Sequence, residues 1–175
     1  MTPAELITEL QQPWQHGEHF DARGAVFDAP VVLDGMALRG FDLSGAHFKS
    51  GLSARRARFM GLTWIGNARI NGKCDLTAAQ FTIDLRAEGL ATEVLCLDHS
   101  QVRGVLDLER LRAQRVSLCN AVVLANLTLE NAEIVDGIDM MNAVVMGGFW
   151  AKGAQLGQVQ TEGAEIDGRI NRPDV

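Results

Sequence analysis

Apolar positions recur along this chain about every eleven residues, most clearly in VSLCNAVVLANLTLENAEIVDGIDMMNAVVMGG, from Val116 to Gly148. Each of the three units in that stretch begins with an apolar residue, has Ala in the sixth place and has an aliphatic residue in the eighth. The template extends from Phe20 to about Ile170, in units that begin at about Phe20, Val31, Phe41, Leu52, Thr63, Cys74, Ile83, Leu95, Leu106, Val116, Leu127, Ile138, Phe149 and Val159. Ten of these fourteen units have Ala in the sixth place, so the repeat governs nearly the whole chain.

The spacing inside each unit predicts two very short strands. Apolar residues alternate at a spacing of two near the first and the eighth place, which is the period of a strand with one buried face. Gly, Asn and Asp between these pairs are typical of corners. A helix would need apolar residues three and four apart, which the units lack. Because one unit cannot bury its apolar face alone, we expect two units to form a four-sided coil and about seven coils to stack into an all-β parallel β-helix.

Two features leave the register of the repeat open in its middle. The unit at Cys74 is shorter than eleven residues and the unit at Ile83 is longer, and the phase between Val94 and Val116 is ambiguous by one residue. Glu88 then falls on the sixth place, which elsewhere holds a small residue. We interpret this as a bulge in the longer unit.

The amino-terminal segment predicts a helix that covers the first coil. Thr2 is an N-cap, Pro3 takes the first helical position, and Glu5 completes a capping box. One apolar side follows, formed by Leu6, Ile7 and Leu10. Pro13 ends the helix near Gln12, and Trp14 is a possible anchor. The expected organisation is a capping helix and connector at 1–19, a repeat domain at 20–170 and a tail at 171–175.

Several units resemble a known family. FDLSGAHF, CDLTAAQF and LTLENAEI are similar to the repeats of the pentapeptide-repeat family, in which a small residue precedes Leu or Phe by two places. That resemblance implies a right-handed quadrilateral β-helix. The chain departs from the family pattern in its eleven-residue period and in the large first residue of each unit. A second segment, AEIDGRI, resembles the polymerising β-helices of the bactofilin type.

Composition and charge narrow the functional classes. Hydrophobic residues make up 47% of the chain, aromatic residues 6%, and there are 18 Gly and no Tyr, which suits a repeat protein with an aliphatic core. The net charge of −6 argues against direct nucleic-acid binding.

Cys74, Cys96 and Cys119 show neither disulfide nor zinc spacing, which favours a reducing cytosol. The amino terminus lacks the features of a signal peptide and no apolar run reaches about 18 residues. We therefore expect a cytoplasmic protein without membrane segments.

Catalytic and metal-binding motifs are missing from the sequence, so we expect a protein that is not an enzyme and holds no cofactor or metal. His16, Glu18 and His19 could bind a metal, but they supply too few ligands, and a connecting loop is the better interpretation. An enzyme with a site along a lateral groove of the β-helix is another possible class of protein, which the absence of long insertions disfavours.

The second place of alternate units should form an acidic ladder along one face. It comprises Asp21, Asp42, Trp64, Asp84, Asp107, Thr128 and Trp150. The four carboxylates could imitate a DNA backbone, which is what certain pentapeptide-repeat proteins that protect DNA gyrase are understood to do. Alternatively, Asp is simply a favoured outward residue of this repeat, with Arg23 and Arg86 neutralising Asp21 and Asp84.

An apolar set points outward in the carboxyl half. Val122 stacks on Val144 and Leu124 on Met146 at the seventh and ninth places, where earlier units have Arg58, Gln80 and Gln101. Together with Trp150 these residues form the candidate interface, because exposed apolar patches mark contact surfaces. A wider core or a misplaced phase is the alternative.

The predicted function is a non-enzymatic interaction scaffold with an unknown protein partner and a possible homodimer through the carboxyl half. Gyrase protection by DNA mimicry and bactofilin-like polymerisation are the alternatives.

Overall fold

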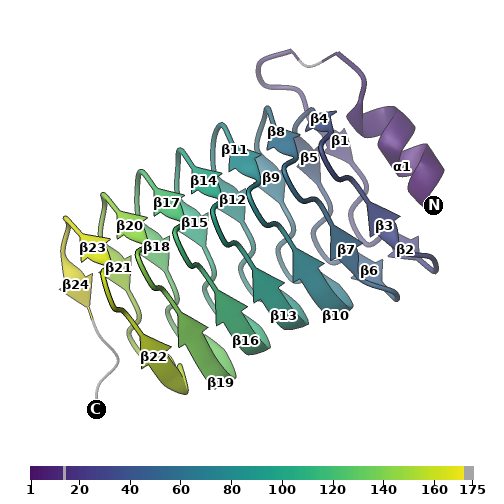
Figure 1. Cartoon of the computed structure of the whole chain (residues 1–175). Coiled ribbons are helices and arrows are strands. Elements are labelled where there is room, and N and C mark those ends of the chain that lie inside the picture. Colours follow the sequence, from purple (N-terminus) through teal and green to yellow (C-terminus); the bar gives the residue numbers. More distant parts are fainter. Residues whose placement is uncertain (14, 172–175) are drawn as a thin grey trace.

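The protein is a parallel β-solenoid of about seven coils with a short helix at one end, as the computed structural model shows for residues 1–13 and 15–171 (Figure 1). The predicted all-β coil fold is confirmed. Trp14, the predicted anchor, and residues 172–175 of the predicted tail lie outside the described residues. The helix and the last strand lie at opposite ends of the stack (Figure 1).

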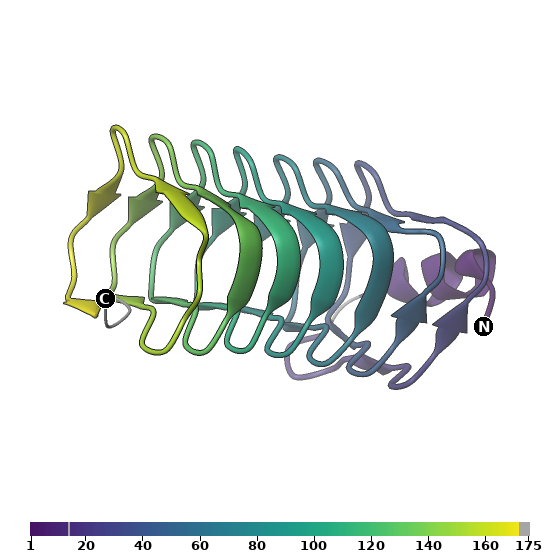
Figure 2. The ribbon, with the colours of Figure 1, turned by 90° about the horizontal axis from the view of Figure 1, so that it is seen from below.

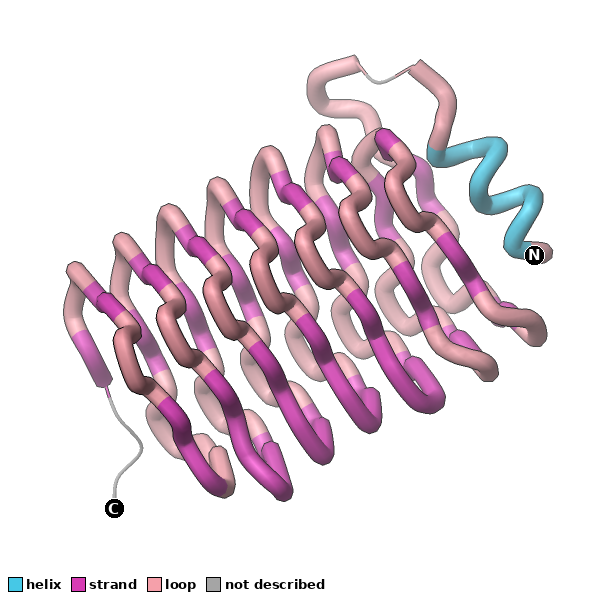
Figure 3. Tube along the Cα trace, viewed as in Figure 1, coloured by secondary structure: helices cyan, strands magenta, loops and turns pink. Residues whose placement is uncertain are grey.

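The strands form three parallel sheets that run along the stack (Figures 1 and 3). Sheet A contains β1 (Phe20–Asp21), β5 (Phe41–Asp42), β9 (Thr63–Trp64), β12 (Leu85–Arg86), β15 (Leu106–Asp107), β18 (Leu127–Thr128), β21 (Phe149–Trp150) and β24 (Ile170–Asn171). Sheet B contains β2 (Val26–Phe27), β6 (His47–Phe48), β10 (Arg69–Asp75), β13 (Ala91–Cys96), β16 (Arg112–Ser117), β19 (Glu133–Asp139) and β22 (Gln158–Gln160), with β3 (Val31–Val32) and β7 (Leu52–Ser53) joined through β10. Sheet C contains β4 (Ala37–Leu38), β8 (Arg58–Phe59), β11 (Gln80–Phe81), β14 (Gln101–Val102), β17 (Val122–Val123), β20 (Val144–Val145) and β23 (Glu165–Ile166).

Successive coils pair residue for residue. Phe20 aligns with Phe41, and Phe41 aligns with Thr63, so one coil takes 21 or 22 residues. Backbone hydrogen bonds join each coil to the next one, for example from Leu127 N to Gly148 O (2.9 Å) and from Asn131 N to Lys152 O (2.9 Å). The hoops of Figure 2 therefore lie directly over one another, and outward side chains form straight ladders along the stack.

Sheet B differs from the prediction of two separate short strands per unit. The first two coils do have separate strands, but β10, β13, β16 and β19 run on through the corner as single strands of six or seven residues. The pairing of β10 with β13 shifts register between Ile70 and Lys73, which marks an irregularity that lets the strand bend. Two of the four expected sides thus merge into one curved sheet, visible in Figure 2.

The core is a column of inward side chains between the sheets. In the amino-terminal half it holds stacked rings, with Phe27 on Phe48 at 4.8 Å and Phe59 on Phe81 at 4.5 Å between ring centroids. In the carboxyl half aliphatic residues take over, as with Leu127 and Val145. The sixth-place alanines are buried in every coil between the first and the last, and Leu90 and Leu111 take the same place, also buried.

The register prediction was wrong at one unit. β12 begins at Leu85, which aligns with Thr63 and Leu106, whereas the predicted start was Ile83. Ile83 and Leu85 are both aliphatic and two residues apart, so the alternation fits either, and only the pairing with neighbouring coils decides between them. Glu88 consequently lies in a turn and not in the sixth place, which Leu90 occupies, buried. The phase between Val94 and Val116 is settled by Leu95, which aligns with Val116.

The fifth place of every unit adopts a left-handed backbone conformation. All fourteen residues have a positive φ between 53° and 71°, and they are Gly24, Gly35, Gly45, Arg56, Asn67, Ala78, Gly89, His99, Arg110, Asn120, Asn131, Asn142, Gly153 and Gly163. Gly and Asn tolerate this region best, which explains ten of the fourteen. The left-handed residue turns the chain by one corner before the buried sixth residue, so it fixes the shape of the coil.

The amino-terminal helix α1 (Pro3–Leu10) covers the first coil, as predicted (Figure 3). Its capping box is present: Thr2 Oγ1 accepts from Glu5 N (3.2 Å) and Thr2 N donates to Glu5 Oε2 (2.8 Å). Leu6 and Leu10 are fully buried against the core. The helix is tied to the second unit by a hydrogen bond from Arg39 N to Leu10 O (2.9 Å).

Neighbouring alanines allow a direct test of the left-handed fifth place. Ala78 has a φ of 56°, whereas Ala79 is fully buried in the sixth place. We expect Ala78→Gly to raise the free energy of unfolding by up to about 1 kcal/mol, because relief of the left-handed strain exceeds the entropy cost of Gly. Ala79→Gly should lower it by about 1–2 kcal/mol through loss of a buried methyl group and added chain entropy. Urea unfolding followed by circular dichroism measures both, and equal destabilisation would contradict the account.

Candidate interaction surface

Four apolar side chains stand together on the outer face of sheet C. Val122 of β17 aligns with Val144 of β20, and Leu124 and Met146 follow two residues later in each coil. Leu124 is 39% exposed and Met146 is 51% exposed, while the two valines are partly buried. We call Val122, Leu124, Val144 and Met146 the face-C patch.

The backbone pairing sets the outward direction of the patch. Val123 and Val145 point into the core and are 2% and 1% exposed, so their neighbours on either side must point outward. Leu124 N donates to Val102 O (2.9 Å) and Met146 N donates to Val123 O (2.9 Å), which places both residues on one ladder. The alternatives of a wider core or a misplaced phase therefore do not describe this part of the chain.

Charged and polar side chains bound the patch along the stack. The coil before it presents Gln101 and Arg103 at the same two places, and the coil after it presents Glu165 and Asp167. The ladder is fixed by hydrogen bonds from Arg103 N to Phe81 O (3.0 Å) and from Asp167 N to Val145 O (3.0 Å). Arg103, Glu165 and Asp167 are exposed, and within the described part of the chain their side chains form no ion pair or hydrogen bond. Sequence reasoning missed these charges, although the seventh and ninth places held the signal.

Trp150 lies around the corner from the patch, not on it. The residue belongs to β21 of sheet A, where it aligns with Thr128 and Asn171. Its indole folds back over the corner between sheets C and A and lies close to Gly148. A methyl group added at Gly148 would be 2.6 Å from the Trp150 Nε1 atom. The predicted grouping of all five residues thus separates into a flat patch of four and a tryptophan at its border.

The predicted acidic ladder is wrong at Asp84. With β12 beginning at Leu85, the residue between Trp64 and Asp107 on the ladder is Arg86, a cation. Asp84 precedes the strand, where its Oδ1 accepts from Val105 N (2.7 Å) and its Oδ2 accepts from Arg86 Nη2 (2.8 Å). The face therefore alternates in charge at its centre.

The other three carboxylates of the ladder cap their own turns. Each accepts a hydrogen bond from the backbone N–H two residues later, which is the geometry of an Asx turn. The pairs are Asp21 with Arg23 (3.1 Å), Asp42 with Ser44 (2.9 Å) and Asp107 with Glu109 (3.1 Å). Hydrogen bonds from Arg23 lower the pKa of Asp21 to about 2. Local turn formation thus accounts for Asp at these places, which favours the simpler of the two interpretations of the ladder.

Of the residues considered for metal chemistry, His19 has a defined aromatic contact. His19 packs its ring edge-on against Trp64, 5.2 Å between ring centroids. Across residues 1–13 and 15–171, no group of three or more His, Cys, Asp or Glu side chains is placed to hold a metal ion. Cys74 is fully buried, and burial raises the pKa of its thiol to about 12. Within the same residues, no helix has the length and apolar character needed to cross a membrane.

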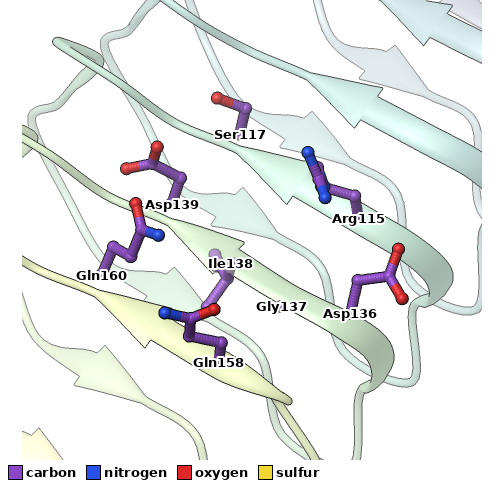
Figure 4. Close-up of a pocket in the computed structure, with 8 residues that line it drawn as sticks. All are labelled: Arg115, Ser117, Asp136, Gly137, Ile138, Asp139, Gln158 and Gln160. Atoms are coloured by element: carbon purple, nitrogen blue, oxygen red, sulfur yellow. The ribbon is translucent and has the colours of Figure 1, made fainter.

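A polar hollow of about 210 Å³ lies on the outside of sheet B (Figure 4). It forms because Gly137 aligns with Arg115 and Gln158 on one ladder, so one side chain is missing from the row. Asp136 and Arg115 stand at its rim, both exposed, and Gln160 lies at its far side (Figure 4).

Substitutions at Asp84 test whether its charge or its hydrogen bond from Val105 N stabilises the fold. Asn126 takes the equivalent place two coils later and accepts from Gly148 N (2.8 Å) in the same way. Asp84→Asn should therefore cost less than about 1 kcal/mol, whereas Asp84→Ala should cost about 1–3 kcal/mol because Val105 N loses its acceptor. Thermal and urea unfolding of both variants gives the comparison. An equal loss for both would mean that the carboxylate charge is what stabilises the corner.

Comparison with known proteins adds no assignment to this geometry: no protein-family model and no curated protein sequence matches the chain.

Proposed function

We propose that the protein is a non-enzymatic interaction scaffold of the pentapeptide-repeat type, which binds a protein partner through the face-C patch. The observation that carries the proposal is the local change of character on one face. Two adjoining coils present Val122, Leu124, Val144 and Met146 where the coils on both sides present polar or charged side chains. An apolar centre with a polar rim is the usual composition of a protein interface.

The rigidity of the scaffold supports the same proposal. Val122 and Val144 belong to strands hydrogen-bonded on both sides, since β17 pairs with β14 and β20, and β20 pairs with β23. Leu124 and Met146 directly follow these strands and are held to the preceding coil by their backbone N–H groups. Their positions are thus set before any partner arrives, and binding orders few additional groups. A stiff, flat surface of this kind suits recognition better than it suits closure around a substrate.

The two alternative functions gain less from the geometry. DNA mimicry requires a continuous negative face, and Arg86 interrupts the ladder with pairs to Asp84 and Asp107. Polymerisation through the ends of the stack would require both end coils to be accessible. Helix α1 buries Leu6 and Leu10 on the first coil, so the core at that end is covered while the helix is in place.

The proposal is tested by charging the patch. We expect Val122→Asp with Met146→Asp to abolish partner binding, because desolvating two carboxylates in an apolar contact costs several kcal/mol. Tagged parent and variant proteins are compared by quantitative affinity capture from lysate of the source cells. The expected result is a set of proteins, including untagged copies of the chain, that the parent retains and the variant loses.

A matched control comes from the other end of the molecule. Val26 and Val32 are 44% and 48% exposed on sheet B, so Val26→Asp with Val32→Asp changes charge and exposed apolar area similarly. The control should retain the parent's set of proteins. If the patch variant remains folded by circular dichroism and still retains that set, the face-C patch is not the contact surface.

A further inference from the structure

The face-C patch and its flanking charges form a pattern that complements itself when reversed. Along the ninth-place ladder the order is Arg103, Leu124, Met146 and Asp167, at a spacing of about 4.8 Å per coil. The order therefore reads cation, apolar, apolar, anion. The seventh-place ladder beside it, with Gln101, Val122, Val144 and Glu165, ends on an acid at the same side.

Resting on the proposed function, we infer that the partner of the face-C patch is a second copy of this chain, packed face to face with its coils running in the opposite direction. The two-fold axis would lie in the interface, parallel to the strands and midway between the coils of Leu124 and Met146. Each ladder of one subunit then faces the same ladder of the other subunit, with the order of its residues reversed. Such an isologous contact uses one surface twice and closes at two subunits.

The reversed arrangement brings unlike groups together. Arg103 faces Asp167 of the second copy, and Gln101 faces Glu165 of the second copy, twice each by symmetry. Leu124 faces Met146 and Val122 faces Val144, which gives a continuous apolar centre. The three charged residues have no ion pair or side-chain hydrogen bond among the residues described here, so they meet the second copy without breaking contacts in the first.

The other way of pairing these faces is electrostatically unfavourable. With the coils running in the same direction, Asp167 would face Glu165 of the second copy, and Arg103 would face Gln101. Like charges placed opposite each other suppress a pairing mode. The sign of the flanking charges thus selects the reversed orientation, while the apolar centre supplies the attraction.

The contact spans four coils, about 14 Å from the first to the last, which is small for a stable dimer. A weak, concentration-dependent dimer follows from that size. It would be detected by sedimentation velocity over a range from about 10 to about 500 µM, where dissociation constants of weak interfaces fall.

Two single charge reversals test the geometry. Arg103→Asp alone puts two acids opposite each other, and Asp167→Arg alone puts two cations opposite each other, so each variant by itself should self-associate at least about tenfold more weakly than the parent. Mixing the two variants places an acid opposite a cation at both ends of the contact, and should restore dimers. The double variant Arg103→Asp with Asp167→Arg should also dimerise. These residues are exposed, so folding is not at issue.

The outcomes separate the orientation from the function. Loss in each single variant, with recovery on mixing, supports the reversed dimer. Dimerisation unchanged in the single variants, or lost instead on Ile170→Asp at the exposed edge of the last coil, overturns it. A parent that stays monomeric throughout the concentration range also overturns the second-copy partner, while loss of captured proteins in the Val122→Asp, Met146→Asp variant would leave the proposed function standing.

Discussion

Residue-for-residue pairing between coils is the constraint on which the rest of this structure depends. Each coil satisfies its backbone by bonding to the coils above and below, as Leu129 N does with Trp150 O (2.6 Å). A slip of one residue would turn every inward side chain outward, so the apolar pattern and the pairing enforce one another. The left-handed fifth residue turns the chain at the same place in every unit, so the corners of successive coils lie over one another and the pairing continues along the whole stack.

The same constraint determines how outward residues are grouped on the surface. Because outward residues stack in ladders, a property shared by the same place of two neighbouring coils becomes a patch, and a single exception interrupts the ladder. Val122 and Val144 become an apolar surface in this way, whereas Arg86 interrupts the carboxylates on sheet A. A fold of this kind does not by itself specify a function, so the core says little about what the outward ladders do.

Much of the fold follows from the sequence by elementary rules. The sixth-place alanines and the alternating apolar pairs were sufficient to predict the coils and their number, and the capping box at Thr2 was sufficient to predict the amino-terminal helix. The start of the unit at Leu85 was not predictable, because Ile83 offers an equivalent alternation and local pattern cannot measure pairing across coils. The merged strands of sheet B were also missed, since whether a corner is a turn or a bent strand depends on the neighbouring coils.

The candidate site was predictable in part. The outward direction of the four patch residues came from the alternation alone, but the place of Trp150 required the corner at Gly148 to be seen. The flanking charges acquired meaning only once Arg103 and Asp167 were known to share a ladder with Leu124 and Met146. Their role depends on the straightness of the stack, which single units do not encode.

The central claim is that the face-C patch meets itself in reverse, and photo-crosslinking tests it most directly. A benzophenone amino acid placed at Gln101, one coil before the patch, should yield a dimer-sized product on illumination. Its crosslinked peptide, identified by mass spectrometry, is expected to contain Glu165 or Asp167. Dimer-sized products joined instead to the coils before Val122, or no such product at concentrations that populate the dimer, would contradict the account.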